Sequence, residues 1–458
     1  MIPRFALSLV ALVLFVSDAA TAQGIVRGGK RQSISPGLER PSGLDLPLDL
    51  VSQGEEQTSL NQMGTALEVV GNYLFVSAPG DGDGRVDIWY RGPNGYLLIQ
   101  QLFVPASIAG DNQFGKSLAA DGGVLVVGTR TGNNAGRAVV HRRAPNGLYY
   151  YESVVAPSNG NVGFSGFADR LAVLEDELLA VSSRGELAVH VFEADGNGRF
   201  PSLSTRILNP VNTGTTPSLS WMTSFGSTVG LHRAPSGLVS VLIGMQDACF
   251  YQRTQMQAPD EVTPDPFGAT AARTGGIAVV RKAGSSWLLQ QRLIPEYSKT
   301  KDFGFEVEVE GSHEAVGAIY SNVFSNGFNA GTASAYRWNG STFELVSTVW
   351  PSTPSQNSLF GYCLEIRDGH LLVGQPQHWG GPQGLVEVFR ITNDDLVAVD
   401  LITAPDGNGA QNQSSLGDSF GRAITSNDRG EVLIGAPFSA PNMGSTPQYA
   451  GGALYLYQ

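Results

Sequence analysis

The chain has 458 residues, with 29 Lys and Arg against 41 Asp and Glu, and a formal net charge of −12. This acidic balance argues against a nucleic-acid-binding protein, which would carry a basic stripe. Gly accounts for 57 residues and hydrophobic residues for 42%. The chain can therefore bury a large core while turning often, which excludes a disordered chain and a coiled coil.

The first 22 residues read as an export signal. Arg4 supplies the positive start, residues 5–16 form the apolar segment, and Ala20-Thr21-Ala22 is a small-residue cleavage site. The apolar segment is shorter than the roughly 20 residues that a membrane-spanning helix needs. We expect cleavage after Ala22, no membrane span, and a mature protein that is secreted, periplasmic or at the cell surface.

Residues 23–43 contain Gly, Ser, Pro and basic residues without a hydrophobic period. This composition is typical of a flexible linker. A basic arm that touches an anionic polymer at the cell surface is the alternative.

An internal repeat organises the remainder of the chain. Its mark is Phe-Gly, with weaker copies at Met63-Gly64 and Ser165-Gly166, and the mean spacing is near 60 residues. The five complete marks are Phe114-Gly115, Phe225-Gly226, Phe303-Gly304, Phe360-Gly361 and Phe420-Gly421. Such a period is the signature of a solenoid or a propeller.

The same order of strands follows each mark. A short segment forms strand one, and a tight turn connects it to an aliphatic run, which forms strand two. A loop then connects strand two to a third strand, which has Gly at or near its start. Asn-Gly or Asp-Gly turns, which favour hairpins, commonly precede a fourth strand. The aliphatic runs are 73–79, 124–130, 178–184, 239–245, 314–320, 371–377 and 432–438. Seven such units predict an all-β, seven-bladed β-propeller of four-stranded antiparallel blades.

The two ends of the chain together supply the strands of the last blade. The seventh unit stops at its third strand, residues 453–457, whereas residues 44–53 have the pattern of a fourth strand without a blade of their own. We expect the N-terminal strand to complete the last blade, which removes the open edges of a linear array. The propeller then spans residues 44–458.

The repeat resembles the FG-GAP repeat of integrin α-chain propellers and of many bacterial exported proteins. The likeness is carried by Phe-Gly before strand one and by Ser77-Ala78-Pro79, Gly374-Gln375-Pro376 and Gly435-Ala436-Pro437 after strand two. Blade three lacks the Phe of the mark, and blade four carries an insertion at 245–275. The resemblance implies binding or adhesion at a cell surface.

Calcium loops of the integrin type do not follow from this resemblance. The turns between strands one and two are short and poor in carboxylates, whereas calcium takes six to eight oxygen ligands. Residues 81–87 come nearest to a calcium loop, but Arg85 stands where a third oxygen ligand would be. We predict no metal site and no cofactor.

The loops on one face vary most in length, and aromatic residues gather in them. Such rings can stack on sugars or anchor a protein partner, or they can simply pack under their own loops. The candidate ligand-binding residues are Arg130, Tyr251, Tyr320, Phe324, His378, Trp379, Phe438 and Tyr449. Trp379 is the strongest single candidate.

The residues that follow each mark form a ring around the central channel. This ring comprises Thr65, Lys116, Phe167, Ser227, Phe305, Tyr362 and Arg422. Lys116 and Arg422 could attract an anion there, or these could be variable positions without a role. The next column favours small residues and includes Cys363, which either packs between blades or pairs with Cys249 of the blade-four insertion.

The sequence contains no nucleophile elbow, zinc-protease motif or phosphate loop, and we predict no catalytic residue. The leading hypothesis is a monomeric, exported, non-enzymatic propeller that recognises an extracellular or cell-surface protein or glycan through its loop face. The alternative is a polysaccharide lyase or hydrolase that assembles Tyr, His and Arg from separate blades. A purely structural subunit of a surface assembly is the third possibility.

Overall fold

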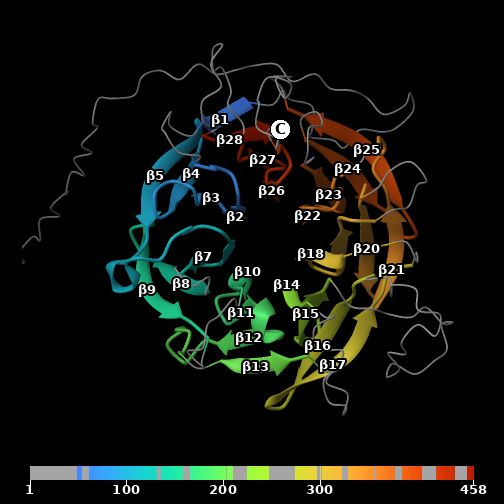
Figure 1. The fold of residues 1–458 in the computed structure, drawn as a ribbon, viewed down its shortest axis with the longest axis horizontal. Helices are drawn as coiled ribbons and strands as arrows, with labels where there is room; N and C mark the ends of the chain where they lie inside the picture. Colours follow the sequence, from blue (N-terminus) through green and yellow to red (C-terminus); the bar gives the residue numbers. More distant parts are fainter. Residues whose placement is uncertain are drawn as a thin grey trace, which may run out of the picture.

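The computed structural model describes residues 49–53, 61–131, 136–157, 166–202, 204–209, 224–246, 274–296, 300, 302–321, 329–354, 357–376, 384–404, 419–438 and 451–457. These residues form seven four-stranded antiparallel sheets arranged as blades around a central opening (Figure 1). The predicted seven-bladed β-propeller is confirmed. The expected signal peptide and linker, residues 1–43, lie outside the described part of the chain.

The first three blades follow one another in chain order. Blade one comprises β2 (Leu67–Val70), β3 (Tyr73–Ala78), β4 (Arg85–Gly92) and β5 (Gly95–Phe103). Blade two comprises β6 (Leu118–Asp121), β7 (Val124–Arg130), β8 (Gly136–Arg143) and β9 (Tyr149–Val155). Blade three comprises β10 (Phe167–Leu174), β11 (Leu178–Ser183), β12 (Ala188–Glu193) and β13 (Thr205–Leu208).

The next three blades repeat this order. Blade four comprises β14 (Phe225–Arg233), β15 (Val239–Met245), β16 (Ile277–Ala283) and β17 (Ser286–Leu293). Blade five comprises β18 (Phe303–Glu310), β19 (His313–Ala318), β20 (Thr332–Trp338) and β21 (Phe343–Val349). Blade six comprises β22 (Leu364–Arg367), β23 (His370–Gln375), β24 (Leu385–Ile391) and β25 (Leu396–Thr403).

The seventh blade joins the two ends of the chain, as predicted. It consists of β26 (Ala423–Ser426), β27 (Val432–Ala436), β28 (Ala453–Tyr457) and the N-terminal β1 (Asp49–Gln53). Strand β1 pairs antiparallel with β28, and the two lie side by side in Figure 1. The described helices are two three-residue turns, η1 (Ala106–Ile108) and η2 (Arg184–Glu186), and neither has the length of a membrane span.

The Phe-Gly mark is a tight turn that starts each blade. In six blades a glycine with φ between 83° and 94° follows the marker residue, as the third position of a type II turn requires. The turn closes through a backbone hydrogen bond, for example from Tyr362 N–H to the Leu359 carbonyl, 3.1 Å. The marker side chain, such as Phe360, is fully buried.

Two further columns of glycine let neighbouring blades approach one another. A Cβ atom on Gly374 of strand two would lie 2.1 Å from the Gly421 carbonyl oxygen of the next blade, and one on Gly384 would lie 1.9 Å from the Phe420 oxygen. Gly331 forms a parallel bridge with Phe360 in the same way. The repeated glycines therefore mark close contacts between blades.

Most hydrophobic clusters lie between neighbouring blades. One cluster joins Phe75 and Ile88 of blade one to Leu125 and Val139 of blade two. The second strand of each blade is covered on both faces, so β7 and β11 are buried almost throughout, as expected for a strand with two packed faces. This packing fixes the first strands around the channel.

Candidate functional site

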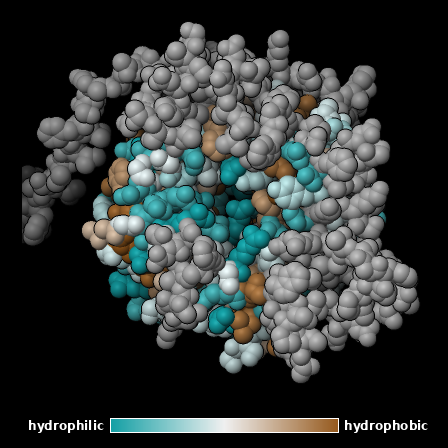
Figure 2. Space-filling model, viewed as in Figure 1, coloured by the Kyte–Doolittle hydropathy of each residue, from teal (hydrophilic) through white to brown (hydrophobic). Residues whose placement is uncertain are grey.

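A polar cavity lies on the axis of the ring. It is a cavity of about 350 Å³ lined by the first strand of every blade. Hydrophilic side chains surround the central hollow in Figure 2. Each blade starts from the same turn, so residues at the same position after that turn lie at the same depth in the channel. These residues form successive layers along the axis.

The first layer, here called the mouth layer, consists of the residues that directly follow each marker pair. These residues are Thr65, Lys116, Asp169, Ser227, Phe305, Tyr362 and Arg422. Six of the seven agree with the predicted channel ring. The seventh, in blade three, does not.

Phe167 is not a mouth residue, and this prediction was wrong. Its side chain is fully buried and takes the place that the marker Phe has in other blades. Ala168 adopts the positive φ of the marker glycine, 58°, and its carbonyl accepts a hydrogen bond from Ser117 Oγ, 2.7 Å. The mark of blade three is therefore Phe167-Ala168, two residues beyond the predicted Ser165-Gly166. Asp169 occupies the mouth position instead.

One side of the mouth combines a cation with aromatic rings. The Arg422 guanidinium lies over the ring of Tyr362, 4.9 Å from its centroid, and 5.8 Å from the centroid of Phe438. Phe305 packs against Tyr362 with 5.0 Å between ring centroids. Among the described residues Arg422 has no carboxylate partner, so its N–H groups remain available to a ligand.

The opposite side of the mouth contains two cations and one carboxylate. Lys116 Nζ lies 2.6 Å from Asp169 Oδ1 and donates a second bond to the Phe167 carbonyl, 3.1 Å. Arg130 NH2 lies 4.0 Å from the same Asp169 oxygen. Burial lowers the pKa of Lys116, and the charge of Asp169 opposes that shift. Asp169 thus neutralises only part of the positive charge here.

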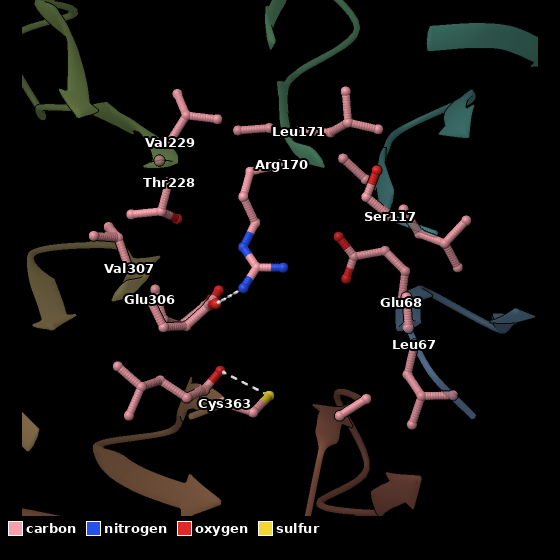
Figure 3. A pocket seen from close by; sticks show the side chains of 18 of the residues that line it. Leu67, Glu68, Ser117, Arg170, Leu171, Thr228, Val229, Glu306, Val307 and Cys363 are labelled. Atoms are coloured by element: carbon pink, nitrogen blue, oxygen red, sulfur yellow. Dashed lines mark hydrogen bonds and ion pairs between the residues drawn. The ribbon is translucent and has the colours of Figure 1, made fainter. Parts of the chain in front are cut away.

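The second layer, the throat, is crossed by an ion pair that the sequence did not predict. Arg170 of blade three reaches toward Glu306 of blade five, with 3.0 Å between NH2 and Oε2, and Glu68 points toward the centre from another side (Figure 3). The guanidinium also lies 5.7 Å from the centroid of Phe305. Arg170 was missed because the shifted mark placed Ala168 in this column.

Below the throat the lining becomes acidic. Glu68, Glu308 and Glu365 occupy equivalent positions in β2, β18 and β22 and all line the cavity. Burial raises the pKa of Glu68 to about 8 and that of Glu365 to about 7. Burial also raises the pKa of Glu308, and the charges of Glu365 and Glu68 add to this effect.

Cys363 lines the throat and has a free thiol. It packs against the hydrophobic cluster that joins blades six and seven, in partial agreement with the predicted packing between blades. Burial raises the pKa of the thiol. Cys249 lies outside the described residues.

The predicted loop residues divide into two groups. Arg130 and Phe438 lie at the mouth, and Tyr320 is 39% exposed. Burial raises the pKa of Tyr320, with smaller contributions from Asp302 and Tyr362. The other candidates, Tyr251, Phe324, His378, Trp379 and Tyr449, lie outside the described residues.

The described histidines lie away from the channel lining. His141, His190 and His232 are buried, and burial lowers the pKa of each. His313 and His370 lie at the turns between strands one and two of blades five and six. The part of the channel that the structure describes therefore presents cations, carboxylates and phenols.

The loop that most resembles a calcium loop is occupied by its own arginine. Arg85 Nε lies 2.9 Å from Asp87 Oδ1, and its NH1 pairs with Asp81. The guanidinium thus lies between the two carboxylates that a cation would need. Among the described residues, no group of three His, Cys, Asp or Glu side chains is placed to hold a metal ion.

No family model and no curated protein matches the sequence. Some solved structures can be aligned with most of this chain. A candidate 6-phosphogluconolactonase from Bacteroides uniformis has 10% identity and a TM-score of 0.49, with 80% of this chain and 87% of that chain covered. A second such candidate, from Bacteroides fragilis, has 11% identity and a TM-score of 0.47, with coverages of 86% and 97%. A streptogramin B lyase has 9% identity and a TM-score of 0.48, with coverages of 90% and 97%. Similarities at this level do not identify the ligand or reaction of this chain.

Proposed function

We propose that this chain is an exported, non-enzymatic binding propeller with FG-GAP-like repeats, and that it recognises an anionic group of a glycan or protein at its mouth. The observation that carries the proposal is Arg422, whose guanidinium is held by Tyr362 and Phe438 without a described carboxylate partner. Aromatic faces orient a guanidinium without neutralising it. The planar N–H groups can then bind a carboxylate or sulfate in bidentate fashion.

The charges across the mouth support the same ligand class. Lys116 and Arg130 both lie near the carboxylate of Asp169, and the nearby Asp111 is paired with Arg137. Arg422 adds a cation without a described carboxylate partner, so the mouth keeps an excess of positive charge. The rings of Phe305 and Tyr362 provide an apolar surface beside these charges. A uronic acid or an acidic peptide offers both an anionic group and an apolar face.

The side chains below the mouth favour binding of an anionic ligand at the mouth over its passage through the channel. An anion that entered the channel would meet the Arg170–Glu306 ion pair in the throat and then the carboxyl groups of Glu68, Glu308 and Glu365. Burial raises the pKa of all three carboxyl groups, so they repel an anion only where the pH is high enough to ionise them. Repulsion increases as these groups ionise. Where these groups are ionised, an anionic ligand therefore stays at the mouth, as expected of a recognition surface.

The proposal is tested by binding of the mature chain, residues 23–458, to acidic and neutral glycans and to acidic peptides, with and without added salt. Arg422→Ala is expected to weaken binding of the acidic ligand about tenfold, roughly 1.4 kcal/mol. Arg422→Lys should restore only part of the loss. Lys282→Ala, which removes a cation from the hairpin at the far end of blade four, is the matched control. Equal affinity of the wild type and Arg422→Ala would contradict the proposal.

A polysaccharide lyase or hydrolase remains the second candidate function. Tyr362 lies against Arg422 and contributes to the raised pKa of Tyr320, and a phenol next to a guanidinium can act as a proton donor. Incubation of each bound glycan with the protein, followed by measurement of new chain ends, distinguishes the candidates. Cleavage that is lost in both Tyr320→Phe and Tyr362→Phe would favour the enzyme over the binding module.

A further inference from the structure

The throat of the channel is formed by seven described residues, one from each blade, that directly follow the mouth residues. Two of them, Arg170 and Glu306, have long charged side chains that reach toward one another across the channel (Figure 3). The other five have small side chains: Ala66, Ser117, Thr228, Cys363 and Ala423. The ion pair is therefore what a ligand at the mouth meets directly beneath it.

Stacked rings connect this ion pair to the cation at the mouth. The Arg170 guanidinium lies 5.7 Å from the ring centroid of Phe305, and the Phe305 ring lies 5.0 Å from that of Tyr362. The Arg422 guanidinium lies 4.9 Å from the centroid of the same Tyr362 ring. Two guanidinium groups thus flank one pair of aromatic rings, which orient them without neutralising their charge. Both line the same cavity, within reach of one short ligand.

Arg170 is less fully bonded than the neighbouring Lys116. Lys116 Nζ donates to Asp169, 2.6 Å, and to the Phe167 carbonyl, 3.1 Å. Arg170 contacts Glu306 through NH2, 3.0 Å, whereas its Nε has no hydrogen-bond partner among the described residues. The Arg170 side chain also keeps 33% of its surface exposed. A guanidinium presents its N–H donors as a planar fork that fits a carboxylate, so Arg170 has donors to offer a second anion.

We propose that Arg170 is a second anion-binding residue of the mouth site, and that Glu306 competes with the ligand for it. This inference rests on the proposed function and narrows the ligand to one with at least two anionic groups, such as a short oligomer of uronic acids. One anionic group binds Arg422, and the second replaces Glu306 on Arg170. A ligand with a single anionic group leaves the ion pair intact, so Glu306 determines specificity.

The released Glu306 carboxyl group does not have to remain as an unpaired charge. Burial raises its pKa, and the charge of Arg170 opposes that shift. Once the ligand has taken over Arg170, this opposing effect is weakened, because the ligand's negative charge offsets the guanidinium. The Glu306 carboxyl group, beside Glu308 and Cys363, can then take up a proton from solvent.

The test compares two probes by isothermal titration calorimetry with the mature chain, residues 23–458. Trigalacturonate carries a carboxylate on each sugar, and galacturonate carries a single carboxylate. Glu306→Gln frees Arg170, so it should bind trigalacturonate about tenfold more tightly than the wild type does. Its affinity for galacturonate, which Arg422 binds, should change by no more than about threefold.

Two further variants separate a contact with Arg170 from a general change in charge. Glu310→Gln removes a carboxylate that lies 3.7 Å from Arg367 at the other end of β18, and it should leave both affinities within about twofold of the wild type. Glu306→Gln/Arg170→Lys has the same net charge as Glu306→Gln but lacks the planar fork, and it should lose most of the gain. Full retention of the gain in this double variant would overturn the proposed contact.

Arg170→Gln tests the same contact with Glu306 in place, should Glu306→Gln fail to fold. It should weaken the binding of trigalacturonate more than that of galacturonate, and equal effects on the two probes would overturn the proposal. A crystal structure of Glu306→Gln with trigalacturonate should place a carboxylate within hydrogen-bond distance of Arg170. Carboxylates at Arg422 alone would overturn the second binding residue.

The role of Arg422 keeps this inference separate from the proposed function. If Arg422→Ala weakens the binding of both probes while Glu306→Gln binds trigalacturonate no more tightly than the wild type, only the competition for Arg170 is overturned. If Arg422→Ala has no effect, the proposed function itself fails. Failure of every variant to bind trigalacturonate would overturn the ligand class named here.

Discussion

The interfaces between blades and the lining of the channel follow opposite rules. At the interfaces the same residue types recur in most blades, and Gly374, Gly384 and the buried Phe420 have like counterparts in most of the ring. In the channel the residue types vary more between blades: Arg170, Glu306 and Cys363 occupy the same layer. Repeated columns therefore close the ring, while the variable columns are where the chain can acquire a specific function.

One position breaks the rule for the interfaces. Glu314 of blade five is fully buried, and neither of its carboxylate oxygens has a hydrogen-bond partner among the described residues. The register places an aliphatic residue at this point in every other blade. These residues are Leu74, Leu125, Leu179, Val241, Leu371 and Val432. A substitution at Glu314 therefore measures how much an aliphatic residue at this repeated position contributes to the free energy of unfolding.

The largest expected effect follows from breaking a repeated contact. In Gly384→Ala the new methyl group would lie 1.9 Å from the Phe420 carbonyl oxygen, so blades six and seven would have to separate. We expect the free energy of unfolding to fall by at least about 3 kcal/mol, as measured by chemical denaturation. Gly196→Ala, where no atom lies within 4 Å of the new methyl, is the control. A loss below about 1 kcal/mol for Gly384→Ala would mean that the blades are not closely packed there.

The second-largest expected effect follows from replacing Glu314 by the aliphatic residue type that the other blades have at this position. Burial raises the pKa of Glu314, so the folded state holds a proton that the unfolded state releases above about pH 4.5. Stability is then lost as the pH rises, and Glu314→Leu should remove this loss. We expect a gain of about 2 kcal/mol in the free energy of unfolding at pH 8, and a smaller gain at pH 5.

The surface substitution Glu177→Leu provides the control, because that side chain is 67% exposed. It should change stability by no more than about 0.5 kcal/mol. A destabilised Glu314→Leu protein would show that the carboxyl group has a partner that stabilises it.

The same contrast explains what the sequence could and could not predict. Repetition predicted seven blades, their strand order and the closure by residues 44–53, of which 49–53 form β1, because each interface reuses the same turn. Blade three was misplaced by two residues because Ala168 takes a left-handed conformation that normally indicates glycine. The Arg170–Glu306 pair was missed because it depends on this register and joins two blades that are not consecutive.

The smallest expected effect is a pH dependence of stability that comes from the channel itself. Burial raises the pKa of Glu68 to about 8, with contributions from Glu365 and Asp121, while the backbone N–H of Ala120 lowers it. The folded state therefore binds more protons than the unfolded state between about pH 4.5 and 8. The free energy of unfolding attributable to Glu68 should fall across this window as the pH rises.

Glu68→Gln tests this contribution, since the amide keeps the shape of the side chain but does not titrate. The free energy of unfolding is measured at pH 5 and at pH 9 for the wild type and for Glu68→Gln. Its decrease between the two pH values should be smaller in the variant by about 1 kcal/mol, a modest value because water in the channel screens the charge. Glu193→Gln, at an ion pair on the surface, should leave the difference unchanged. Identical pH profiles for the wild type and Glu68→Gln would mean that the channel carboxylates are well hydrated, and repulsion within the channel would then not hold an anionic ligand at the mouth.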